Sequence, residues 1–264
     1  MMNFKSFVYI FILIVVLSSA DGSKKSTEHP NPCENNNNST NKPINDIDIL
    51  VLSQKWSPTI CYQLQKRYKN YTSNLCNEKK WLISGLKPSL QHYPGPAFCN
   101  CSMEFDLLKL SPIMKDLETK WIDSLVNSHR NHSYLSHQWT KYGTCGTAIN
   151  EINNQFNYFN KSLELFDKFN IERILSNNTI NPGHSYRKKS FGAAFFKNFN
   201  NKVQLTCIVN HDTEEFYLSG IELCFDKQFN LVHCVGSGIN RQTDKCPSKK
   251  RPIVYLDSIL KQAN

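Results

Sequence analysis

The stretch "SYLSHQWTKYGTC", residues 133–145, places a histidine and a lysine four positions apart. On a helix, His137 and Lys141 share one face, and Gln138 and Tyr142 form the neighbouring row. Two potential cations on one face suit a phosphate group, although a solvated surface helix has the same pattern. Taken alone, this stretch leaves open whether the helix binds a ligand.

Two other stretches accompany it: "LVLSQKWSPTIC" at 50–61 and "WLISGLKP" at 81–88. In order and spacing, the three resemble the signatures of the ribonuclease T2 family, roughly QxWPxxxC, FTIHGLWP and FWxHEWxKHGTC. The resemblance continues through "YFNKSLELFDKFNIERIL" and "IELCFDKQFNLVHC", which are similar to the animal branch, and covers about residues 48–250. It implies a ribonuclease T2-like fold and a metal-independent endoribonuclease that cleaves single-stranded RNA through a 2',3'-cyclic phosphate.

This sequence departs from the family pattern at the positions of the catalytic residues. The family's two catalytic histidines align with Ser84 and Tyr142, its glutamate with Gln138, and the tryptophan of GLWP with Lys87. His137 and Lys141 match, and the resemblance implies that they bind and neutralise phosphate. Trp81, His137 and Lys141 are therefore the expected substrate-binding residues.

Serine has no useful basicity, and tyrosine, with a reference pKa of about 10, is a poor acid for this reaction. Each lost acid or base typically removes about 10²- to 10⁴-fold in rate. The main hypothesis is a pseudoenzyme that is dead or strongly impaired and still binds RNA or phosphate. The alternatives are an active endoribonuclease that pairs His137 with a histidine from elsewhere, and a signalling or effector protein that binds a receptor or glycan.

The N-terminal region predicts secretion. Residues 1–20 have the Lys5 start, apolar core and small residues of a signal peptide, and no other apolar run predicts a membrane span. Residues 21–46 are Asn-rich and poor in large apolar side chains, which predicts a disordered arm. The expected location is extracellular, or endolysosomal by the secretory route. Asn-x-Ser/Thr sites agree with this: Asn37, Asn38, Asn70, Asn100, Asn131, Asn160 and Asn177.

Residues 47–255 are expected to form one α+β domain with a C-terminal tail at 256–264. Apolar and β-branched runs predict strands at 47–55 and 81–86, the second closed by a turn at 87–89. Ser111 and Pro112 predict a helix start, and residues 151–169 have helical spacing. Later runs at 202–209, 216–225 and 231–235 are strand-like. Helices followed by separate strands favour a largely antiparallel central sheet flanked by helices.

Ten cysteines after a signal peptide predict disulfides. The family resemblance implies Cys61–Cys76, Cys99–Cys145, Cys207–Cys246 and Cys224–Cys234. Cys33 and Cys101 are left over, and the simple expectation is a fifth bridge between them; the alternative is that Cys101 and Cys99 exchange roles. No cofactor is expected. The spacing of His129, His132 and His137 completes no metal-ligand set, so no metal is expected either.

The formal charge of +9 favours RNA or another polyanion as partner. Two short basic clusters, at 187–189 and 249–251, suit phosphate or sulfate groups, although solvated loops have the same composition. A monomer is expected.

Overall fold

The computed structural model describes residues 47–68, 71–90, 95–121, 131–234, 246–247 and 251–258. These residues form a seven-stranded sheet flanked by helices. Its backbone path runs in the order β2-β1-β5-β7-β3, while β4 and β6 pair with β5. The pairs are antiparallel except for β5 with β7. The strands are β1 (Ile49–Trp56), β2 (Trp81–Ser89), β3 (His184–Arg187), β4 (Gln204–Val209), β5 (Phe216–Phe225), β6 (Leu231–Val232) and β7 (Pro252–Tyr255).

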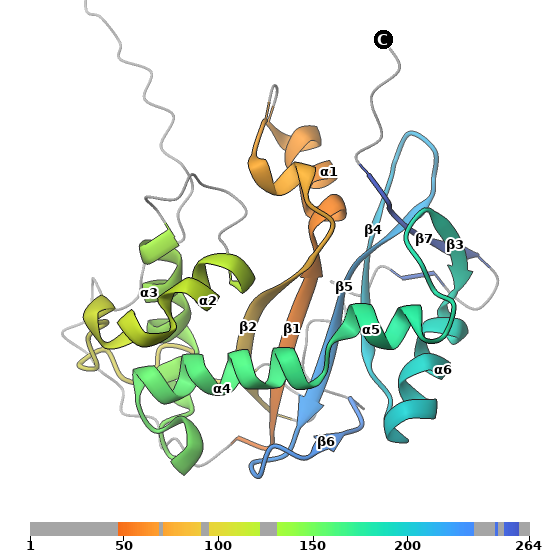
Figure 1. Ribbon diagram of the computed structural model, residues 1–264. Coiled ribbons are helices and arrows are strands. Elements are labelled where there is room, and N and C mark those ends of the chain that lie inside the picture. The colour runs from red at the N-terminus through yellow and green to blue at the C-terminus, as the bar shows by residue number, and fades with distance from the viewer. Residues whose placement is uncertain are drawn as a thin grey trace, which may run out of the picture. The chain divides into compact units, whose positions relative to one another are not determined.

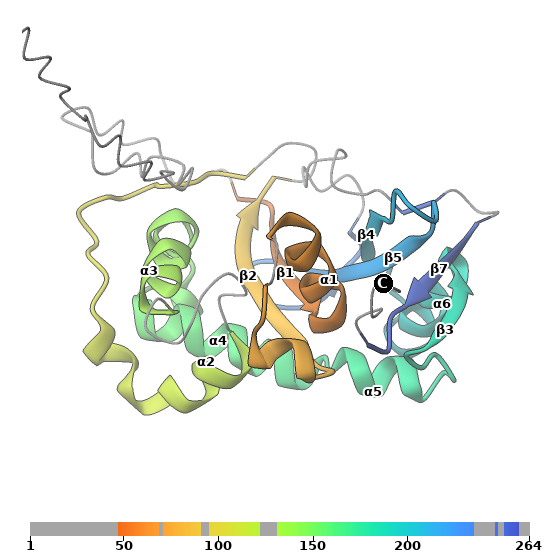
Figure 2. The ribbon, with the colours of Figure 1, turned by 90° about the horizontal axis from the view of Figure 1, so that it is seen from above.

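Helices flank this sheet. Figure 1 shows α4 lying across β2, β1 and β5, with α2 and α3 beyond the β2 edge, and Figure 2 shows the same elements from above. The helices are α1 (Ser57–Arg67), α2 (Met114–Lys120), α3 (Asn131–Lys141), α4 (Gln155–Lys168), α5 (Ile171–Ser176) and α6 (Lys188–Phe199). The α+β class with a largely antiparallel sheet is therefore confirmed.

The main core lies between the sheet and α4. Leu50, Leu52 and Trp56 alternate along one face of β1, and Phe159 of α4 belongs to the same buried cluster. The period of two along the strand and the near-four period along the helix place these apolar groups on facing surfaces. On the opposite face of β1, Ile49 and Val51 belong to a second buried cluster, and the polar residues Ser53 and Lys55 follow them along the strand.

Two sequence-based boundaries are wrong. The expected turn at 87–89 is the end of β2, because this strand is at the sheet edge, where Pro88 removes no ladder hydrogen bond. Ser111 and Pro112 do not start a helix: they lie inside a 3-10 segment, Leu107–Ile113, and α2 begins at Met114. The Asp106 side chain caps that segment by accepting from the Leu108 N–H at 3.0 Å.

The structure contains the four disulfides that the family resemblance implies, Cys61–Cys76, Cys99–Cys145, Cys207–Cys246 and Cys224–Cys234. Cys101 is also disulfide-bonded. Its expected partner Cys33 lies outside the described residues, as do the signal peptide, the arm and residues 259–264 of the tail. In the part of the chain that the structure describes, no helix is long and apolar enough to cross a membrane.

A β-bulge interrupts the pairing of β1 with β2. Ser53 pairs with Gly85 and Gln54 pairs with Ile83, so Ser84 is the extra residue on β2. Gly85 has φ +151°, a conformation that side-chain-bearing residues rarely adopt. A Cβ atom at this glycine would lie 2.6 Å from Oε1 of Gln138 in α3. At the bulge, a side chain of α3 therefore lies in close contact with the sheet edge.

Replacing Gly85 with alanine should destabilise the protein by about 1–3 kcal/mol, because the backbone is strained and the new methyl group meets Gln138. The cost should be smaller in a Gln138→Ala background, which removes the side chain in the way. Urea unfolding of the wild type, both single variants and the double variant measures this. Equal costs in the two backgrounds would show that Gln138 does not hold α3 against Gly85.

Candidate functional site

Hydrogen bonds fix α3 against β2 at one point and against residues 98–103 at two others. The Tyr134 hydroxyl donates to the Ser84 carbonyl at 3.2 Å, and the Trp139 indole N–H donates to the Met103 carbonyl at 2.9 Å. At the helix end, the Phe98 N–H donates to the Lys141 carbonyl at 2.9 Å. The Cys99–Cys145 disulfide ties the same two segments together. These contacts determine which side chains of α3 face the bulge.

His137 and Lys141 lie on one face of α3, as their spacing predicts. The ring centres of His137 and Phe98 are 6.0 Å apart, and the Lys141 ammonium is 5.9 Å from the centre of the Phe98 ring. His137 is exposed, yet partial desolvation and then the Lys141 charge lower its pKa below the ordinary value of 6.5. A neutral imidazole beside an ammonium group is poised to gain a proton when an anion binds.

Two ammonium groups lie near the ring of Tyr142. Its ring centre is 5.2 Å from Nζ of Lys141 and 5.9 Å from Nζ of Lys87. Lys87 comes from β2, and its Cε lies 3.6 Å from the position that a Cβ would take on Gly85. The lysine that replaces the family's tryptophan therefore brings a further positive charge next to Tyr142.

Gln138 is buried over the bulge, and its Oε1 has no hydrogen-bond partner. The amide keeps the size of the glutamate that the family pattern has at this position while removing its charge. An unpaired buried carbonyl oxygen is costly, so this group is available to a donor that enters the site.

Ser84 faces away from the main core. It lines an open cavity of about 620 Å³ between α1 and the turn joining β4 to β5. Lys55 of β1, Lys66 and Arg67 of α1, and His211 of the turn line the same cavity. Sequence reasoning could not place His211, because its position depends on strand pairing far from the matched motifs.

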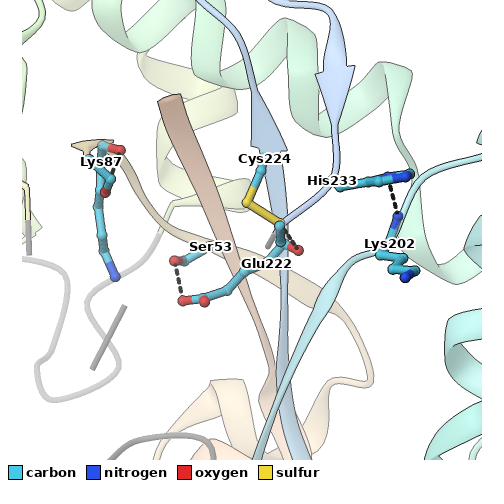
Figure 3. Close-up of a disulfide and its surroundings, with 8 residues drawn as sticks. Ser53, Lys87, Lys202, Glu222, Cys224 and His233 are labelled. Atoms are coloured by element: carbon cyan, nitrogen blue, oxygen red, sulfur yellow. Dashed lines mark hydrogen bonds between the residues drawn. A yellow bond between two sulfur atoms is a disulfide. The ribbon is translucent and has the colours of Figure 1, made fainter. Parts of the chain in front are cut away.

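A polar row crosses the sheet face beside this cavity. The Ser53 hydroxyl donates to Oε1 of Glu222 at 2.9 Å, while Oε2 of Glu222 is buried without a hydrogen-bond partner. Figure 3 shows Lys87, Ser53 and Glu222 on three neighbouring strands. Desolvation lowers the pKa of Lys55, and Lys87 lowers it further, whereas Glu222 opposes the shift. The sequence gives no sign that this lysine is partly buried.

Of the predicted site residues, the structure groups His137, Lys141 and Tyr142 at the end of α3 and brings Gln138 over the β2 bulge where Ser84 lies. Trp81 lies apart. It is buried, its indole N–H donates to the Tyr255 hydroxyl at 2.9 Å, and its ring packs 5.5 Å from that of Trp56. A ring paired in this way stabilises the core and offers no surface to a substrate.

The described residues contain no group of three or more His, Cys, Asp or Glu side chains that could hold a metal ion. His184 is exposed on β3, and Nδ1 of His233 accepts the Lys202 N–H at 3.2 Å. His92 and His129 lie outside the described residues, and the side chain of His132 is not described.

Comparison with known proteins identifies the fold and the family. Ribonuclease Oy of Magallana gigas is 32% identical over 214 residues, which cover 80% of this chain and 96% of the relative. Human RNase T2 superposes with a TM-score of 0.65 at 24% identity, covering 79% of this chain and 98% of that structure. A mutant of RNase MC1 of bitter gourd, solved in complex with 5'-GMP, gives a TM-score of 0.64 at 26% identity, covering 72% and 94%. The model of the ribonuclease T2 family matches residues 47–234, and the chain therefore belongs to this family.

Proposed function

We propose that this protein binds RNA through its phosphate groups and cleaves it poorly or not at all. The observation that carries the proposal is the pair of replacements at the two family histidine positions, Ser84 and Tyr142. The reaction of the family needs a base for the 2'-hydroxyl proton and an acid for the leaving oxygen. Neither a serine nor a tyrosine hydroxyl titrates near neutral pH, so the acid–base pair is missing.

The groups that remain suit binding. His137 and Lys141 are the family's phosphate-binding positions by resemblance, and Lys87 adds another ammonium group near Tyr142. Two ammonium groups near the Tyr142 ring, with His137 on the same helix face as Lys141, form a positive surface for a phosphodiester. The relatives are named ribonucleases and one solved neighbour holds 5'-GMP, which supports RNA as the partner.

We also propose that the chain follows the secretory route. The signal-like residues 1–20 and the disulfides of the folded part support this. Among the sequons, Asn177 is exposed at the end of α5, whereas Nδ2 of Asn160 donates to Glu164 at 2.7 Å within α4. Glycan attachment is therefore expected more readily at Asn177 than at Asn160.

The second candidate function is a slow ribonuclease, and one observation favours it. His211 lines the same cavity as Ser84, so an imidazole from outside the matched motifs lies near one lost position. Wild-type protein that cleaves single-stranded RNA, with a loss of about 10²-fold or more in both His137→Ala and His211→Ala, would establish this alternative.

A receptor- or glycan-binding signalling protein is the third candidate. In that case the positive surface around Tyr142 would be irrelevant to RNA. Affinity for a single-stranded RNA hexamer that is indifferent to salt and to Lys141→Gln would favour this candidate over RNA binding.

Restoring the family residues should restore cleavage. The triple variant Ser84→His, Gln138→Glu, Tyr142→His should gain at least about 10²-fold in the rate of cyclic-phosphate formation over wild type. Lys87 and Lys141 would both lower the pKa of the new imidazole at 142. Adding Lys87→Trp should therefore increase the rate further.

The matched control is Ser84→Asn, Gln138→Glu, Tyr142→Phe, which changes the same positions without supplying an imidazole and should stay inactive. Cleavage is followed by ³¹P NMR of the 2',3'-cyclic phosphate. If the folded triple variant with Lys87→Trp remains as inactive as the control, loss of the two imidazoles does not explain the inactivity.

RNA affinity should rise as the pH falls through the lowered pKa of His137. Above that pKa the imidazole is neutral, and below it the added charge strengthens phosphate binding. Fluorescence anisotropy with an RNA hexamer between pH 8 and pH 5 measures this, and His137→Asn should flatten the profile. Tighter binding at higher pH, or an unchanged profile in His137→Asn, would contradict the assignment.

A further inference from the structure

The α1–β4 cavity, defined as the cavity that Lys55, Ser84 and His211 line, has the chemistry of a small-molecule site. Its volume of about 620 Å³ falls within the range usual for pockets that hold small ligands. Basic side chains supply one part of its lining, and the apolar side chains of Ile60 and Ile208 supply another. This combination suits a ligand with an anionic group and a less polar ring.

The charges of the α1–β4 cavity are unbalanced. Asp212 is the one carboxylate among its described lining residues, and it pairs with Lys66 through an Nζ to Oδ2 contact of 2.5 Å. Lys55 and Arg67 make no ion pair with another described residue, although the Arg67 guanidinium lies 5.4 Å from the Tyr68 ring centre. Two cations are therefore left to face an anionic ligand.

Lys55 is the more constrained of these two cations. It is partly buried on β1, and desolvation lowers its pKa, with Lys87 acting in the same direction. A phosphate near its ammonium group would offset both effects by supplying the missing negative charge. The buried carboxylate of Glu222 compensates in part, but its Oε1 already accepts from Ser53.

Strand β2 contributes both to the α1–β4 cavity, through Ser84, and to the surface around Tyr142, through Lys87. Ser84 lines the cavity, while its carbonyl accepts from Tyr134 of α3. Lys87 interacts electrostatically with Lys55 and lies 5.9 Å from the ring centre of Tyr142. Basic groups therefore follow one another from His137 and Lys141, through Lys87, to Lys55.

We propose that the α1–β4 cavity binds one nucleotide unit of the same RNA strand whose neighbouring phosphate His137 and Lys141 hold. The phosphate of this unit lies at Lys55 and Arg67, and its sugar or base contacts Ile60 and Ile208. The inference rests on the proposed RNA-binding function and extends it to a second position on the strand. Free mononucleotide is the other source of the same chemistry, and the experiment separates the two.

The experiment uses the folded chain, a single-stranded RNA hexamer and 5'-UMP. Affinity for the hexamer is measured by anisotropy over a series of salt concentrations, and the methyl signals of Ile60 and Ile208 are followed by NMR with each probe. Lys55→Gln should reduce the slope of log affinity against log salt by about 0.7, the value for one phosphate contact on a single strand. Lys55→Arg should keep the wild-type slope.

Lys197→Gln is the matched control, because Lys197 is an exposed lysine of α6 outside the cavity lining. It removes the same charge and should leave the slope unchanged. Arg67→Gln provides the independent second variant: it lies on an exposed helix end, and its slope should also fall. If Lys55→Gln does not fold, the slope measured for Arg67→Gln tests the proposal in its place.

The hexamer should shift both isoleucine methyl signals, and Lys55→Gln should abolish these shifts. If 5'-UMP shifts them and the hexamer does not, the cavity takes free nucleotide and the proposal is overturned. If hexamer binding depends on Lys141 but is indifferent to Lys55 and Arg67, the inference fails while the proposed function stands. Wild-type protein that does not bind the hexamer at all would remove the proposed function itself.

Discussion

The close approach of α3 to Gly85 brings the side chains of α3 beside the edge strand β2. Gln138 rests against this glycine, and a side chain at position 85 would push α3 away from the edge strand. The same approach brings Tyr142 beside Lys87 and lets Tyr134 reach the Ser84 carbonyl. The bulge re-aims one strand residue and the glycine admits the helix, while hydrogen bonds and the Cys99–Cys145 disulfide hold α3 in place.

The charged side chains near Tyr142 suit phosphate binding better than acid–base catalysis. Catalysis by imidazoles needs groups that exchange protons near neutral pH. Here, two hydroxyl groups occupy the corresponding positions, and Lys87 and Lys141 place their ammonium groups near Tyr142. Lysine at position 87 also lowers the pKa of Lys55, so the added charges influence one another across β2 and β1.

The sequence predicts the parts of this arrangement that depend on local pattern. The alternating run at 216–225 has the bounds of β5, and the spacing of His137 and Lys141 puts them on one helix face. Pro88 led to the wrong prediction of a turn at 87–89. A proline can lie within a strand at the edge of a sheet, and whether a strand is at the edge depends on the whole sheet. The short strands β3 and β7, four residues each, carry too little pattern to be predicted alone.

The burial of Lys55 and the position of His211 were out of reach for a related reason. Both depend on α1 and the β4–β5 turn lining the same cavity, although they are about 150 residues apart in the sequence. No local sequence pattern predicts such a long-range arrangement. Trp81 shows the converse limit. The family pattern marks the residue, but only its contacts with Tyr255 and Trp56 reveal that the ring is part of the core.

The most direct test holds single-stranded RNA in a complex with excess wild-type protein and follows binding and strand integrity in the same sample. Anisotropy reports the bound fraction, and gel analysis of aliquots reports cleavage over hours. The account predicts RNA that is bound and intact, and that is released by Lys141→Gln or by added salt. RNA that is cut to cyclic-phosphate ends within a few seconds of binding, at the rate of an intact family member, would contradict it.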